Sequence, residues 1–224
     1  MANGPSVIVF DVNETLSDMA PMRDRFAQIG CPPDHARLWF ASLLRDGFAL
    51  TAAGDMDRFA VIGAEALRIL LTDVHLTMAT DQAIDHIMQG FMMLDVHPDV
   101  PDGVRSLRAA GYRLVTLTNG ATRVADQLFA RAGIQEEFEA LLSVEDAPAW
   151  KPAASSYKYV ARVCGVDTSE LLLVAVHPWD IHGASRAGLG TAWVNRAGGL
   201  YPSYFASPDH VIEDLGNLAH ALPS

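Results

Sequence analysis

The sequence predicts an α/β fold, in which a Rossmann-like parallel sheet forms the core and a helical segment is inserted after the first strand. From Arg113 onward, short apolar runs alternate with helical patterns, as in the βαβ units of a parallel sheet. After the first apolar run, about eighty residues contain no convincing strand and show the apolar spacing of helices. These two observations predict one strand, then a helical insertion, then the remaining strands.

The expected strands are short apolar runs bounded by turn residues. They are Val7–Phe10, Arg113–Thr118, Leu141–Val144, Leu171–Val176, Thr191–Val194 and a last short strand at His210–Ile212. The helices expected between them each end before a glycine, which adopts the left-handed conformation common just after a helix. They are Asp102–Ala110, Thr122–Ala132 and Ser155–Cys164, and a final helix ends near Leu222.

The insertion shows apolar faces at helical spacing, which predict a packed helical subdomain. These faces contain Leu38, Trp39, Leu43, Phe59, Ile62, Ala66, Leu70, Ile84, Ile87, Met88 and Phe91. Their periodicity does not distinguish a substrate lid from a structural appendage. The sheet is expected to resume near Pro98–Asp102. The predicted division is therefore a core of residues 1–16 and 96–224, with the insertion at 17–95.

The charge balance restricts the partners. The chain has 16 Lys and Arg against 27 Asp and Glu, so its formal net charge is −11. Such a surface repels phosphate backbones and anionic lipids, which favours a small-molecule partner over nucleic acid or membrane. Neither a signal segment nor a run long enough to span a membrane is present, which predicts a cytoplasmic protein. Cys31 and Cys164 match no metal-ligand spacing and are expected to be buried thiols.

Polar residues follow the first two strands, where an open parallel sheet binds its ligands. Asp11 directly follows the first strand and is placed to act as a nucleophile. The alternative for this residue is a cap of the next turn. Thr118 and Asn119 end the second strand, and their hydroxyl and amide suit an anionic group or a leaving halide.

A lysine and a second carboxylate complete the set. Lys151 precedes a proline and is therefore held extended at a helix entrance. An ammonium near Asp11 would lower the pKa of that carboxyl by about 1–3 units and keep it ionised. The most apolar strand is followed by His177, Trp179 and Asp180. The alternatives are a solvated loop for the lysine and a helix cap for the second aspartate.

These segments, in this order and at this spacing, resemble the haloacid dehalogenase superfamily, and more narrowly its L-2-haloacid dehalogenase (type II) branch. The resemblance spans essentially the whole chain. It implies that Asp11 is the nucleophile, and it matches the family's other motif residues to Thr15, Thr118, Lys151 and Asp180. It also implies that the inserted helices form a cap domain that closes over the site.

Further matches favour the type II branch. Tyr157 matches its substrate-side tyrosine, Trp179 with Asp180 matches its Trp-Asp pair, and Asn119 matches the amide associated with the halide. The implied reaction is hydrolytic dehalogenation of short 2-haloalkanoic acids to 2-hydroxy acids. Asp11 attacks the halogen-bearing carbon, and water hydrolyses the resulting ester. Asp180 is the expected base or water-positioning group.

Two alternative functions stay open. Superfamily phosphatases carry a second aspartate two residues after the nucleophile, whereas this chain has Asn13 there, which is assigned to the substrate side. Only Asp180 is acidic in the fourth motif, so a Mg²⁺ site is short of negative charge. We therefore expect no metal and no other cofactor, with a Mg²⁺-dependent phosphatase as the alternative enzyme. The alternative from another class is a catalytically silent member that binds a small carboxylate or a protein.

Three departures from the family pattern affect the substrate pocket. The family's cap arginine has no match, so Trp39 and Arg45 are assigned to substrate binding, with Arg37 as the alternative arginine. Ala175 and His177 stand where a serine and an asparagine are usual. His177 is expected to orient water or accept its proton, the alternative being a histidine bonded to the backbone. Because type II relatives are commonly dimers, the resemblance also suggests a homodimer.

Overall fold

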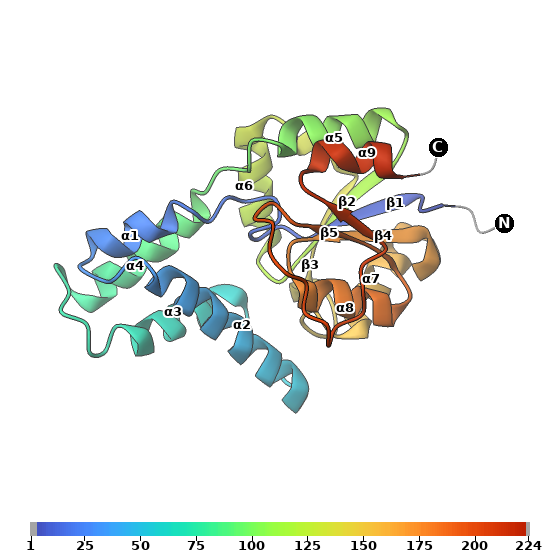
Figure 1. The fold of residues 1–224 in the computed structure, drawn as a ribbon. Coiled ribbons are helices and arrows are strands. Elements are labelled where there is room, and N and C mark those ends of the chain that lie inside the picture. Colours follow the sequence, from blue (N-terminus) through green and yellow to red (C-terminus); the bar gives the residue numbers. More distant parts are fainter. Residues whose placement is uncertain (1–3, 223–224) are drawn as a thin grey trace.

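The structure is a computed structural model, and it describes residues 4–222. Its centre is a sheet in which every neighbouring pair of strands is parallel, in the order β3-β2-β1-β4-β5-β6 (Figure 1). The strands are β1 (Val7–Phe10), β2 (Arg113–Thr118), β3 (Ala140–Ser143), β4 (Leu171–Ala175), β5 (Gly190–Val194) and β6 (His210–Ile212). The α/β fold class predicted from the sequence is confirmed.

The helices form two groups. Between β1 and β2 lie α1 (Met22–Gln28), α2 (His35–Ala53), α3 (Phe59–Leu70), α4 (Thr80–Met92) and α5 (Val100–Ala109). After β2 come α6 (Thr122–Ala132), α7 (Ala154–Cys164), α8 (Pro178–Ala187) and α9 (Leu218–Ala221). Short 3₁₀ helices are η1 (Gln135–Glu137), η2 (Val144–Asp146), η3 (Thr168–Glu170) and η4 (Leu215–Asn217). In Figure 1, α1 to α4 stand to one side of the sheet, whereas the other helices cover it.

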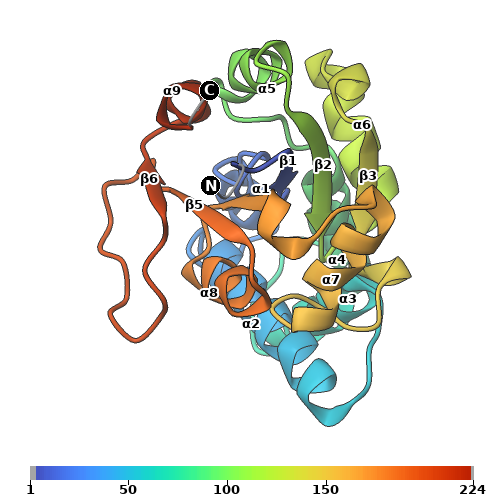
Figure 2. The ribbon, with the colours of Figure 1, turned by 90° about the vertical axis from the view of Figure 1, so that its right-hand side faces the viewer.

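Strand β1 shows how the layers arise. Its side chains alternate between the two faces of the sheet, and all of them are buried. Ile8 and Phe10 belong to the core beneath α5, α6 and α9, whereas Val7 and Val9 belong to the core shared with α7 and α8. Figure 2 shows these helices on opposite sides of the sheet. A strand that is apolar at every position is thus explained by burial on both faces.

Most predicted element bounds agree with the structure within one or two residues, but the expected return of the sheet near Pro98–Asp102 is wrong. Helix α5 begins at Val100, and the next strand begins only at Arg113. The strand predicted to reach Val176 ends at Ala175, because the N–H of Val176 donates to the Thr15 hydroxyl rather than to a neighbouring strand.

The insertion has its own aromatic interior, which is continuous with one face of the sheet. Trp39 and Leu43 are fully buried there, and the apolar cluster that contains them also contains Val7 and Val9 of β1. Leu38, expected on the apolar face of this helix, is instead 52% exposed.

Two connecting segments lie side by side where the insertion meets the sheet domain. Ser17 and Val96 form an isolated antiparallel bridge between them. The domain bounds drawn from the sequence fall beside this pair, and they stay a prediction.

Two further features concern the chain as a whole. Cys31 and Cys164 are both buried and free, as expected. Within residues 4–222, no helix is both long enough and apolar enough to cross a membrane.

Candidate active site

The site lies at the topological switch point of the sheet, where the strand order reverses. Strand β1 lies between β2 and β4, so the chain adds strands on one side of β1 and then returns to its other side. Ligands of open α/β sheets bind beyond the carboxyl ends of strands at such a point. Asp11 follows β1 there, and its N–H donates to the Val174 carbonyl of β4 at 3.0 Å.

A buried ammonium joins two carboxylates at this edge. Nζ of Lys151 lies 2.8 Å from Oδ1 of Asp11 and 2.6 Å from Oδ2 of Asp180. The side chains of Lys151 and Asp180 are completely buried, and that of Asp11 is 5% exposed. Charge-assisted hydrogen bonds of this length are among the stronger ones in proteins. The sequence-predicted trio of aspartate, lysine and aspartate is therefore brought together.

Burial and neighbouring charges set the ionisation of this trio. Burial raises the pKa of Asp11, but the Lys151 charge and a bond from His177 outweigh burial and hold the pKa well below its ordinary value. For Lys151, burial lowers the pKa, and the two carboxylates more than reverse that effect. Burial raises the pKa of Asp180, and the nearby charge of Asp11 adds to the rise. The carboxylate of Asp11 is therefore ionised.

Hydroxyl groups fix the orientation of both carboxylates. The Thr15 hydroxyl donates to Oδ2 of Asp11 at 2.6 Å and accepts the Val176 N–H at 3.1 Å. The Tyr157 hydroxyl donates to Oδ1 of Asp180 at 2.6 Å. Burial, with the charge of Asp180, raises the pKa of Tyr157 well above its ordinary value, so the phenol remains a donor.

His177 lies between Asp11 and a second acid, Glu14. Its Nδ1 is 3.2 Å from Oδ2 of Asp11, and its Nε2 is 2.8 Å from Oε2 of Glu14. Its ring stacks between Phe40 and Trp179, with centroid distances of 6.3 and 5.0 Å. Burial lowers the pKa of His177, but hydrogen bonds to the two carboxylates reverse this and raise it to about 9. The backbone-bonded alternative for His177 does not describe these contacts.

Glu14 was not singled out from the sequence. Its φ is +63°, a left-handed conformation that is uncommon outside glycine and is often found at functional sites. Its N–H donates to the Ser17 hydroxyl at 3.2 Å, and its carbonyl contacts Nε2 of His97 at 3.0 Å. Its place three residues after Asp11, on the same loop, is the signal that was available.

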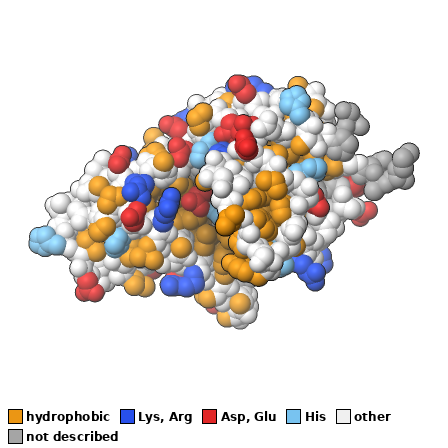
Figure 3. Space-filling model, viewed as in Figure 1, with side chains coloured by type: hydrophobic (Ala, Val, Ile, Leu, Met, Phe, Trp, Pro, Cys, Tyr) orange, Lys and Arg blue, Asp and Glu red, His pale blue; other side chains and the backbone are white. Residues whose placement is uncertain are grey.

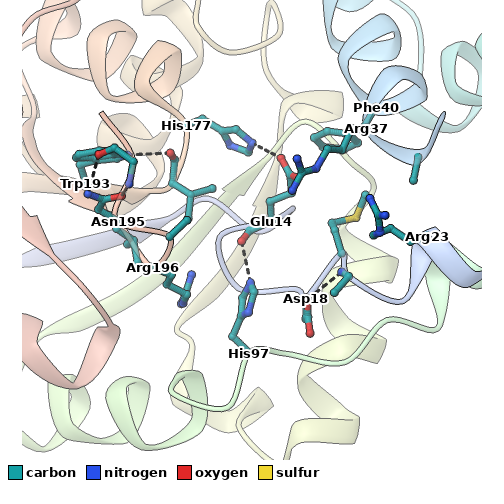
Figure 4. Close-up of a pocket in the computed structure, with 17 residues that line it drawn as sticks. Glu14, Asp18, Arg23, Arg37, Phe40, His97, His177, Trp193, Asn195 and Arg196 are labelled. Atoms are coloured by element: carbon teal, nitrogen blue, oxygen red, sulfur yellow. Dashed lines mark hydrogen bonds and ion pairs between the residues drawn. The ribbon is translucent and has the colours of Figure 1, made fainter. Parts of the chain in front are cut away.

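A cavity of about 520 Å³ opens beside His177 (Figure 4). Its volume lies in the range of small-molecule pockets. Its walls come from the loop after β1, from α1 and α2, from the residues before α5, from the loop after β4, and from the end of β5 with the segment that follows it. They include Glu14, Arg23, Arg37, Phe40, His97, His177, Trp193, Asn195 and Arg196. In the space-filling view, charged side chains of both signs gather where the helical insertion meets the sheet domain (Figure 3).

The structure separates the candidates on α2. Arg37 lines the cavity together with Phe40, because residues three apart share a helix face. Arg45 does not line it: its side chain is 70% exposed and pairs with Asp46. Trp39 is completely buried inside the insertion and donates its indole N–H to the Gly63 carbonyl. The assignment of Trp39 and Arg45 to the substrate side is therefore not supported, whereas Arg37 is in place.

Of the three remaining candidates, Asn119 contacts the backbone of the lysine. Asn119 accepts the Lys151 N–H at 3.1 Å and donates to the Lys151 carbonyl at 3.4 Å. The Thr118 hydroxyl accepts the Gly120 N–H at 3.0 Å. Asn13 is 8% exposed and borders a separate cavity of about 10 Å³. None of these three side chains lines the large cavity.

The donor set does not fit Mg²⁺. Nζ of Lys151 already occupies the position between Oδ1 of Asp11 and Oδ2 of Asp180. Their other oxygens accept hydrogen bonds from Thr15 and Tyr157. In the described part of the chain, no group of three or more His, Cys, Asp or Glu side chains could hold a metal ion. Hard cations need several free oxygen ligands, which this arrangement does not offer.

Comparisons with known proteins agree with this site. A family model described as "haloacid dehalogenase-like hydrolase" matches residues 5–188. The chain is 28% identical to haloacetate dehalogenase H-2 of Moraxella sp. (strain B), over 96% of each chain. Its fold matches a crystal structure of a dehalogenase with a TM-score of 0.92, at 25% identity and full coverage of both chains. It also matches the L-2-haloacid dehalogenase of Xanthobacter autotrophicus with chloropropionic acid covalently bound, at 26% identity, 96% and 97% coverage and a TM-score of 0.85.

Proposed function

The chain belongs to the haloacid dehalogenase-like hydrolase family, and on this premise we propose that it hydrolyses the carbon–halogen bond of short 2-haloalkanoic acids through an aspartyl ester. The observation that carries the proposal is the ionised carboxylate of Asp11 beside Lys151, on a loop that offers Asn13 where a phosphatase needs an acid. A halide leaves without a proton, so a carboxylate nucleophile and a fixed positive charge suffice. The names of the relatives and the covalent chloropropionic acid adduct of one relative support this assignment.

In the first step, a carboxylate oxygen of Asp11 attacks the carbon that bears the halogen. A new C–O bond forms while the C–X bond breaks, and the bonding electron pair leaves with the halide. Attack from the side opposite the halogen inverts that carbon. Thr15 and Lys151 hold the carboxylate in one orientation, which lowers the entropic cost of reaching the transition state.

In the second step, water hydrolyses the ester and releases the 2-hydroxy acid. We propose that His177 is the base that accepts the proton of this water, because its side chain borders the cavity. Asp180, by contrast, is fully buried between Lys151 and Tyr157. Asp11 loses its negative charge on becoming an ester, so one of the two anions that raise the pKa of His177 disappears. The imidazolium can then lose its proton to solvent and accept one from the attacking water. It passes that proton to the alkoxide oxygen of the 2-hydroxy acid as the ester C–O bond breaks and the Asp11 carboxylate is restored.

The substrate carboxylate requires a cation, and we assign this role to Arg37. It lines the cavity that His177 borders, and no hydrogen bond or ion pair engages its guanidinium among the described residues. A planar guanidinium matches a carboxylate through two parallel hydrogen bonds. We also propose that the reaction is independent of metal ions, on the grounds of the donor set. Cytoplasmic residence and a homodimer stay predictions of the sequence.

The first experiment measures halide release from chloroacetate, bromoacetate and each enantiomer of 2-chloropropionate in the presence of EDTA. Asp11→Asn serves as the blank. We expect release that survives EDTA and disappears in the variant. Turnover that stops with EDTA and returns with Mg²⁺ would contradict metal independence. Absence of release across the panel would contradict the dehalogenase assignment, and a Mg²⁺-dependent phosphatase screen would follow.

A further inference from the structure

Arg196 connects three segments that meet behind the nucleophile. It follows β5 closely, and its guanidinium forms a two-pronged ion pair with Asp99, at 3.1 Å from Nε to Oδ1 and 2.8 Å from Nη2 to Oδ2. Its Nη1 donates to the Thr15 carbonyl at 2.9 Å. Asp99 directly precedes α5, and its Oδ2 also accepts the Leu215 N–H at 2.9 Å. One guanidinium thus holds the catalytic loop, the start of α5 and the end of β5 together.

Thr15 connects Arg196 to Asp11. Its backbone carbonyl accepts the bond from Arg196, and its side-chain hydroxyl faces Asp11. That hydroxyl donates to Oδ2 of Asp11 at 2.6 Å. A shift of the Thr15 backbone would therefore move the hydroxyl that fixes the nucleophile. The Arg196 and Asp99 side chains are only 20% and 19% exposed, so little water competes for the ion pair.

We propose that Arg196 is a positioning residue of the dehalogenation reaction, which acts through the Thr15 carbonyl to hold the Thr15 hydroxyl on Asp11. Asp99 fixes the plane of the guanidinium so that one N–H group points at that carbonyl. Arg196 also borders the large cavity, which suggests direct binding of the substrate as the competing role. Three of its N–H groups already donate to Asp99 and Thr15, which favours the positioning role over substrate binding.

The chain provides a matched control in Arg113. This arginine also forms a two-pronged ion pair, with Glu139 at 2.7 and 2.6 Å, and also donates to a backbone carbonyl, that of Cys164 at 3.0 Å. It is the first residue of β2, at the opposite edge of the sheet from Asp11. Arg113→Gln therefore removes the same kinds of bonds without touching the catalytic loop.

The test compares halide release by wild type, Arg196→Gln, Arg196→Lys and Arg113→Gln, with thermal unfolding of each. The inference rests on the proposed function, so wild-type turnover is measured first. We expect Arg196→Gln to lower kcat by about tenfold to a hundredfold with KM within about twofold, because small displacements of reacting groups have effects of this size. Arg196→Lys keeps the charge but cannot reach both partners, so its kcat should fall as well. Arg113→Gln should keep the wild-type kcat.

A second comparison tests whether the effect of Arg196→Gln on kcat is transmitted through Thr15. We expect Arg196→Gln to have less than about a twofold effect on kcat when Thr15→Val is already present, because residues that act through one another are not additive. A full effect in that background would overturn the inference. So would a raised KM with unchanged kcat, which indicates substrate binding, or a kcat equal to that of Arg113→Gln. If Arg196→Gln does not fold, the same criteria apply to Arg196→Lys. A wild type that releases no halide would overturn the proposed function, and this inference with it.

Discussion

Nζ of Lys151 lies 2.8 Å from Oδ1 of Asp11, although 140 positions separate the two residues in the sequence. Both side chains are almost completely removed from water. A buried charge is costly unless an opposite charge compensates it, so each residue depends on the other for its ionisation. The pair therefore affects both the stability of the fold and the ionisation of Asp11.

Lys151→Met is expected to destabilise the protein strongly. It leaves Asp11 and Asp180 buried without their shared cation, and breaking such a pair from one side typically costs about 3–5 kcal/mol in free energy of unfolding. Urea denaturation measures this loss. Lys158→Met, at an exposed position on α7, should change the same quantity by less than about 0.5 kcal/mol. Equal effects of the two substitutions would contradict the role given to the buried ammonium.

The stability contributed by His177 is expected to disappear at alkaline pH. Its pKa in the folded protein, about 9, lies above the ordinary 6.5, so the folded state favours the protonated ring. This contribution is fully present below about pH 6.5 and is lost as pH rises through about 9. The free energy of unfolding of wild type minus that of His177→Gln should therefore shrink between pH 6.5 and 9.5. A difference that does not change with pH would refute the prediction, and His220→Gln is the exposed control.

His177→Gln is also expected to stop the reaction at the ester. Glutamine can form hydrogen bonds, but it cannot take a proton from water, whereas Asp11 remains free to attack the substrate. We predict one halide per protein molecule in a rapid phase, followed by little turnover, and an intact-mass increase equal to the carboxyalkyl group esterified to Asp11. Asp11→Asn should show neither. Continued turnover by His177→Gln would transfer the role of base to Asp180.

Arg37→Gln is expected to weaken substrate binding. Removing the cation that faces the cavity should raise KM for 2-chloropropionate by about tenfold or more, since hydrogen bonds to charged groups contribute about 1.5–3 kcal/mol. Arg45→Gln provides the matched control on the same helix, because that side chain points to solvent and pairs with Asp46. Steady-state kinetics of both variants check the prediction. A larger KM effect for Arg45 would restore the original assignment made from the sequence.

Gly183→Ala is expected to disturb the site without changing a polar residue. A Cβ at this position would lie 2.6 Å from the Tyr157 hydroxyl and 2.6 Å from Cβ of Pro152. Tyr157 would have to move away from Asp180, so we expect a loss of about 1–3 kcal/mol in free energy of unfolding and a lower kcat. A Cβ at Gly63 would lie 2.9 Å from the tip of Leu43 and in ordinary contact with the end of Met88, so Gly63→Ala should leave kcat unchanged. Unfolding curves and halide release of both variants provide the comparison.

Much of the fold and of the catalytic edge could be predicted because local rules apply to them. Hydrophobic runs predicted the positions of the strands. Polar residues shortly after β1, β2 and β4 predicted Asp11, Asn119 and Asp180. The same rule applied to β5 would have found Arg196, which follows that strand closely. Glu14 was missed because its importance depends on a left-handed backbone and on an imidazole 163 positions away.

The sequence by itself determined the parallel α/β core, the inserted helices and the aspartate and lysine of the site. Only the tertiary structure decided which arginine of α2 faces the cavity, and that His177 lies between Asp11 and Glu14. The physical reason is that strand and helix patterns are set by neighbours along the chain, within a few residues. The direction of a side chain on a given helix face, and the charge it meets there, depend on how distant elements pack against each other.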